Sequence, residues 1–169
     1  MTVSARKLSW GRRAAAFVAA LLFAAAWGVL AQTQFNLQAL APFVDLPIGV
    51  RLRTSLQDLV GFGPVYAGLV LAAWIPAFLV AWPLARRLPR LRVGWYALAA
   101  GVGLIVAIRS ADAVAPMPVL IDATRSTFGL LVLALGSALG GALFAWLTRR
   151  HAGRSERAIG AQAPEGASA

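Results

Sequence analysis

Four long apolar runs, each without a charged residue, constrain the fold of this chain more than any other feature. The runs are 14–31, 64–85, 93–108 and 128–147. An apolar helix of about 20 residues matches the roughly 30 Å hydrocarbon core of a bilayer. Only helices and closed barrels satisfy all their backbone hydrogen bonds there. The sequence therefore predicts an all-α integral membrane protein, in which residues 1–150 form a single domain, a bundle of four transmembrane helices.

Composition excludes several function classes. Hydrophobic residues make up 60% of the chain and charged residues 13%, whereas soluble domains are about 45–50% apolar and about 25% charged. The lack of cysteine removes thiolate metal sites and iron–sulfur clusters. The only histidine, His151, follows the last run, so a bis-histidine haem site is not expected. We therefore expect no catalytic residue, no metal and no cofactor, and we favour a non-enzymatic protein.

The basic residues predict the orientation of the four spans. By the positive-inside rule, the segments flanking the spans that are rich in Arg and Lys lie in the cytoplasm. Attraction of these residues to anionic lipid and the topology together account for the net charge of +10, so nucleic acid is not an expected partner. The Ala- and Arg-rich composition favours a bacterial inner membrane protein with both termini cytoplasmic. The basic residues concerned are Arg6, Lys7, Arg12, Arg13, Arg86, Arg87, Arg90, Arg92, Arg149, Arg150, Arg154 and Arg157.

The two ends of the chain are interpreted separately. Residues 1–31 have an alternative interpretation as a cleaved signal peptide, because a basic start and an apolar run precede the small-residue pattern Val29-Leu30-Ala31. The run is longer than the roughly 7–15 residues of such a peptide, which favours a retained first span. Residues 151–169 are rich in Ala, Gly, Ser and Glu, and we expect a disordered cytoplasmic tail there.

Residues 32–63 form the one sizeable segment between the apolar runs. Pro42 and Pro47 mark a turn in its middle. The residues after Pro47 repeat apolar side chains at three- and four-residue spacing, with polar side chains on the opposite face. We expect a short helix lying in the outer membrane interface. Its apolar residues are Ile48, Leu52, Leu56, Leu59 and Val60, and its polar residues are Arg51, Thr54, Ser55 and Asp58.

Charged residues outside the cytoplasmic segments form the candidate site. Arg109 and Asp112 are three residues apart, as are Asp122 and Arg125, a spacing that places each pair on one face of a helix. With Arg51, Arg53 and Asp58 they could wall a pocket for an anion or a lipid headgroup. The alternative is that they are solvated pairs worth about 0–1 kcal/mol each. Asp58 is too far along the helix to pair readily with Arg51, so Arg51 and Arg53 are the cations expected to lack partners.

Small residues in the fourth run predict close helix packing. Gly136 and Gly140 have the Gly-x-x-x-Gly spacing, and Ser137 and Gly141 repeat it one residue later. Such residues let two helix backbones approach closely in a membrane. The contact could be made within the bundle, with Gly101 and Gly103 of the third run as counterparts, or between two copies of the chain.

Two hypotheses for function follow. The first is an accessory or assembly subunit of a larger membrane complex, whose partners are other membrane proteins or a second copy of the chain. The alternative is a lipid-headgroup or anion-binding protein, whose partners are membrane lipids and whose site is the outer Arg and Asp cluster.

Overall fold

The structure is a computed structural model that describes residues 10–114 and 122–149. The tail expected at 151–169 lies outside these ranges. Every regular element among the described residues is helical. The elements are α1 (Trp10–Leu40), α2 (Ile48–Gly61), α3 (Gly63–Arg87), the 3-10 helix η1 (Pro89–Leu91), α4 (Arg92–Val114), the 3-10 helix η2 (Asp122–Arg125) and α5 (Thr127–Leu147).

The four long helices α1, α3, α4 and α5 are long and apolar enough to cross a membrane. Each contains one of the apolar runs, which confirms the all-α class and the four candidate spans predicted from the sequence. All four helices extend beyond their runs, α1 and α4 by the most residues. α1 continues from Ala31 to Leu40 and α4 continues from Ile108 to Val114, because a polar residue ends an apolar run without interrupting a helix.

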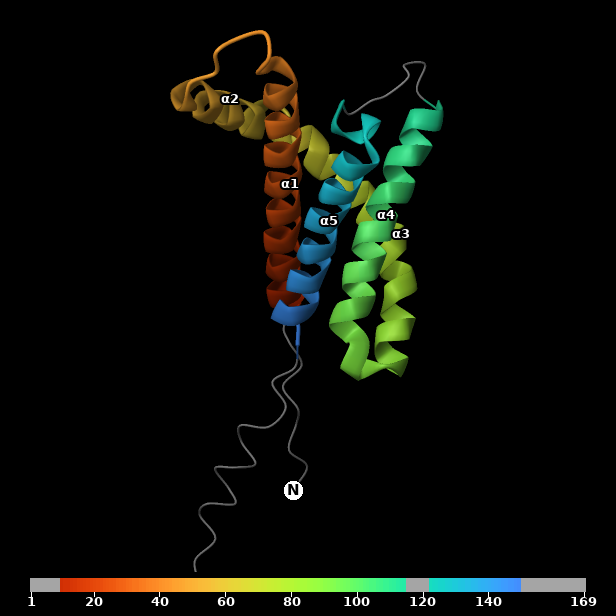
Figure 1. The fold of residues 1–169 in the computed structure, drawn as a ribbon. Coiled ribbons are helices and arrows are strands. Elements are labelled where there is room, and N and C mark those ends of the chain that lie inside the picture. Colours follow the sequence, from red (N-terminus) through yellow and green to blue (C-terminus); the bar gives the residue numbers. More distant parts are fainter. Residues whose placement is uncertain (1–9, 115–121, 150–169) are drawn as a thin grey trace, which may run out of the picture.

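The long helices pack as antiparallel neighbours, and α2 lies across one end of the bundle (Figure 1). The first turn of α1, the η1 turn and the last turn of α5 share the opposite end (Figure 1). We call this the basic end. Its charged side chains among the described residues are all arginines, whereas every described aspartate belongs to the other end. The arginines are Arg12, Arg13, Arg86, Arg87, Arg90, Arg92 and Arg149.

The glycines of α5 lie against the three other long helices. A Cβ atom on Gly140 would lie 2.9 Å from Cβ of Ala24 in α1 and 2.9 Å from the ring of Trp74 in α3. Gly136 lies against the Trp27 ring of α1, and Gly141 against the Tyr96 carbonyl of α4. The small-residue face of α5 is therefore buried inside the bundle.

The two glycines of α4 face different helices. A Cβ atom on Gly101 would lie 3.3 Å from the carbonyl oxygen of Ala134 in α5. On Gly103 it would lie 2.8 Å from Cβ of Ala77 in α3. Gly101 is thus a counterpart of the α5 glycines, while Gly103 belongs to the contact between α3 and α4.

A buried hydrogen-bond chain joins three helices at the centre of the bundle. Trp74 Nε1 donates to Ser137 Oγ at 2.9 Å, and Ser137 Oγ donates to the Ala100 carbonyl at 2.7 Å. Ser137 therefore has a polar role in addition to its small size. A cluster of aromatic rings with edge and stacked contacts continues from Trp74 toward the basic end: Phe17, Phe78, Tyr96 and Phe144.

Replacing Gly140 with Ile tests this packing. The added side chain must displace Ala24 or Trp74, and overpacking of this kind costs about 1–3 kcal/mol. We expect a lower midpoint of thermal unfolding in detergent.

Gly94→Ile is the matched control, because nothing lies within 4 Å of a Cβ atom at Gly94 of α4. It should leave the midpoint unchanged. Equal midpoints for Gly140→Ile and the unmodified protein would contradict the packing described above.

Candidate functional site

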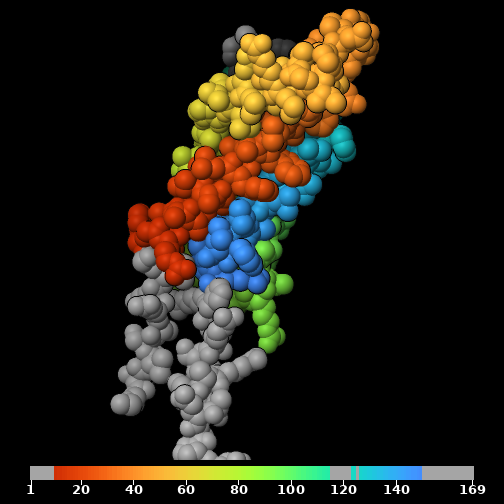
Figure 2. Space-filling view, turned by 90° about the vertical axis from the view of Figure 1, so that its left-hand side faces the viewer, coloured from red at the N-terminus to blue at the C-terminus, as the bar shows by residue number. Residues whose placement is uncertain are grey.

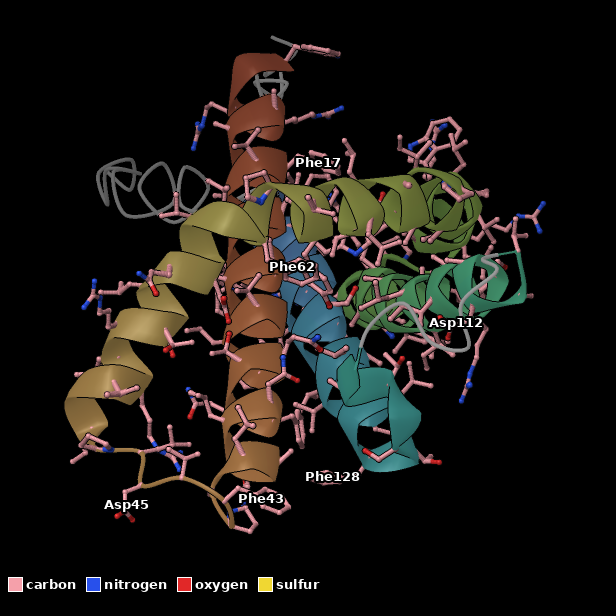
Figure 3. All side chains as sticks on the ribbon, turned by 90° about the horizontal axis from the view of Figure 1, so that it is seen from above. Phe17, Phe43, Asp45, Phe62, Asp112 and Phe128 are labelled. Atoms are coloured by element: carbon pink, nitrogen blue, oxygen red, sulfur yellow. The ribbon has the colours of Figure 1, made fainter. Side chains whose placement is uncertain are left out.

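The structure separates the charged residues proposed as one site into two groups. Arg51, Arg53 and Asp58 belong to α2, which packs on α1 and α3. Arg109 and Asp112 belong to the last turns of α4. Asp112 and the loop that carries Asp45 into α2 lie on opposite sides of α1 (Figure 3). The charged side chains that the structure describes therefore do not surround a single pocket. Asp122 and Arg125 are the first and last residues of η2, and their side chains lie outside the described part of the structure.

The pairing expected between Arg109 and Asp112 is not seen. Arg109 is exposed, and its guanidinium forms no ion pair with any residue that the structure describes. Asp112 is half-buried and has another interaction partner. Sequence spacing placed both residues correctly on one helix, but the structure shows no ion pair between them.

Three consecutive polar residues of α1, Gln32, Thr33 and Gln34, make up the polar turn that anchors the neighbouring elements. The Thr33 hydroxyl lies 2.7 Å from Asp58 Oδ2 and 2.9 Å from the Val29 carbonyl, so its one hydrogen is shared between two acceptors.

The other two residues of the polar turn extend these links. Gln34 Nε2 donates to Ser55 Oγ at 3.1 Å, and the backbone N–H of Ala123 donates to Gln32 Oε1 at 3.1 Å. The polar turn thus fixes α2 on one side of α1 and η2 on the other.

The polar side of α2 faces the protein, while most of its apolar side faces outward. Ser55 is 8% exposed, whereas Leu56 and Val60 are 66% and 79% exposed. An amphipathic helix of a soluble protein buries its apolar face. The reverse arrangement suits a helix whose outer surroundings are lipid, as in helices that lie in a membrane interface. Figure 2 shows α2 as a surface element at the end of the molecule opposite the basic end.

An apolar groove lies between α1 and α3, next to the end of α2. Its volume is about 470 Å³, within the roughly 300–1,000 Å³ of small-molecule sites. The groove is open on one side, and α1 and α3 pack against each other less extensively than the other long neighbours. Leu59, from the apolar side of α2, closes one edge, so the apolar face of α2 continues into the groove. Other lining residues are Ala25, Ala26, Val29, Gly63 and Ala67.

The described residues contain no group of three His, Cys, Asp or Glu side chains that could hold a metal ion. The carboxylate nearest to the groove along the chain, Asp58, is hydrogen-bonded to Thr33. Comparison with protein families, curated proteins and solved structures found no match, so the case for function depends on this geometry.

Sequence reasoning missed the parts of the site that depend on tertiary structure. The hydrogen bond between Thr33 and Asp58 joins residues from two helices, and no periodic pattern relates them. Half of the residues that line the groove are alanine or glycine, and nothing in the apolar runs indicates that a space is left between the helices. The one available signal was the amide-rich stretch after Ala31, which marked the polar turn.

Proposed function

We propose that this chain is a non-enzymatic lipid-binding protein of the bacterial inner membrane, in which α2 lies in the outer interface and binds anionic headgroups. The observation that supports this most directly is the orientation of α2. Its polar residues Ser55 and Asp58 hold it to α1, and its apolar residues Leu52, Leu56 and Val60 are exposed. A helix held in this way places its cationic side chains at headgroup depth.

Arg51 and Arg53 are the proposed phosphate ligands. Neither forms an ion pair with a described residue, and the carboxylate on the same helix, Asp58, accepts a hydrogen bond from Thr33 instead. Guanidinium groups bind phosphate through paired, charge-assisted hydrogen bonds. Arg51 is half-buried against the protein and Arg53 is exposed, so the two can approach a headgroup from different sides.

The distribution of charge supports the proposed orientation. The basic end carries only arginines among the described charged residues, and the positive-inside rule assigns such an end to the cytoplasm. Both termini then lie in the cytoplasm and α2 lies on the outer side. α1 contributes Ala20, Ala24 and Val29 to the core, which favours a retained first span over a cleaved signal peptide.

Single cysteines test this orientation, since the chain has none of its own. An impermeant thiol reagent should label Asp45→Cys in intact cells, because this exposed residue lies between α1 and α2. Leu88→Cys, at the exposed turn between α3 and α4, should be labelled only after the membrane is permeabilised. The opposite labelling pattern would invert the proposed orientation.

Removing the two cations tests lipid binding. Arg51→Gln together with Arg53→Gln should bind phosphatidylglycerol about 30-fold more weakly, since each Arg near a membrane surface contributes about 1 kcal/mol. Native mass spectrometry of the purified protein in mild detergent measures the bound lipid. The thermal unfolding midpoint should stay unchanged, because neither side chain forms an ion pair with a residue that the structure describes.

Arg109→Gln is the matched control for charge. It removes an exposed cation from the same end of the bundle but from the other side of α1, so phosphatidylglycerol binding should be retained. Unchanged binding in the double variant, or an equal loss in Arg109→Gln, would rule out α2 as the specific headgroup site.

The second candidate, an accessory subunit of a larger complex, is favoured by a different surface. The α5 glycines are buried, but Gly68 and Ala72 of α3 are both exposed and have the spacing that allows close helix approach. A partner helix would contact this face of α3. Loss of a co-purifying protein in Gly68→Ile, with lipid binding intact, would support this candidate.

A further inference from the structure

We propose that the groove between α1 and α3 holds one acyl chain of the phospholipid whose headgroup α2 binds. This inference rests on the proposed function, which concerns the lipid headgroup, and adds a site for the acyl chain of the same lipid. The observation behind it is continuity: Leu59 belongs to the apolar face of α2 and also lines the groove. A lipid held by the α2 arginines can therefore pass its chain along Leu59 into the space between the two helices.

The groove matches an acyl chain in chemistry and position. Its exposed lining is almost entirely apolar, and small residues such as Ala26, Gly63 and Ala67 leave room for a flexible chain. The residues of α1 that line it precede the polar turn, so the groove lies on the membrane side of the hydrogen bonds that hold α2. A headgroup beside α2 and a chain in the groove then have the order that a phospholipid has in a bilayer.

The headgroup is needed to make the occupant specific. Bilayer tails are as apolar as the groove, so a chain gains packing contacts but no hydrophobic free energy by entering it. Because the acyl chain is attached to a phosphate that α2 binds, its effective concentration at the groove is high. Charge therefore favours a phospholipid over a partner helix as the occupant, because Arg51 and Arg53 form no ion pair with a described residue and belong to the helix whose Leu59 lines the groove.

The test varies the groove and the headgroup site separately in the full-length protein. Ala26→Leu fills the groove, and Ala67→Leu fills it from the other wall. Ala19→Leu makes the same change at an exposed position of α1 outside the groove. The probes are dipalmitoyl phosphatidylglycerol and dihexanoyl phosphatidylglycerol, which share a headgroup but differ in chain length. Native mass spectrometry reports bound lipid, and thermal unfolding reports whether each variant folds.

We expect Ala26→Leu and Ala67→Leu to bind the dipalmitoyl lipid about tenfold more weakly. Their binding of the dihexanoyl lipid, which reaches the arginines but cannot fill the groove, should match that of the unmodified protein. Ala19→Leu should bind both lipids normally.

The alternatives give different results. If the groove variants bind dipalmitoyl lipid normally while the Arg51 and Arg53 double variant loses it, the groove inference fails and the headgroup site remains. If only the groove variants lose lipid, the chain site remains and the proposed headgroup function fails. If a protein co-purifies with the unmodified chain and is lost in Ala26→Leu, the occupant is a partner helix and the inference is wrong.

Discussion

Close approach of α5 to its neighbours is the constraint on which the rest of the structure depends. In a bilayer no hydrophobic force drives one helix onto another, so packing contacts and buried hydrogen bonds must hold the bundle. Gly140 and Gly141 allow this approach, and it places Ser137 where it accepts from Trp74 and donates to the Ala100 carbonyl. A side chain at these glycines would separate the helices and break the polar chain.

The candidate site depends on a contrast with this tight packing. The glycines of α5 let α1 pack closely on α5, whereas α1 and α3 leave a groove beside the α1 residues that precede the polar turn. Thr33 and Gln34 then hold α2 over this region through Asp58 and Ser55. Because these hydrogen bonds use the polar face of α2, its apolar face is left exposed. An exposed apolar face of this kind is typical of helices that lie in a membrane interface.

The sequence predicted the parts of the structure that follow from local physics. Lipid requires continuous apolar segments, so the four candidate spans could be read directly, and the spacing from Ile48 to Val60 predicted the helix that the structure shows as α2. Features that depend on contacts between helices could not be predicted from the apolar runs and spacings. The continuation of α1 to Leu40, the separation of Arg51 from Arg109, and the groove beside Leu59 all depend on how helices meet, which no single-helix pattern encodes.

The depth of α2 in the membrane is the most direct test of this account. Spin labels on single cysteines at Leu52, Leu56, Gln57 and Val60 would be measured in liposomes for collision with oxygen, which concentrates in lipid, and with a water-soluble nickel complex. The account predicts oxygen accessibility at Leu52, Leu56 and Val60 and nickel accessibility at Gln57. Nickel accessibility at all four positions would place α2 in water and contradict lipid binding by this helix.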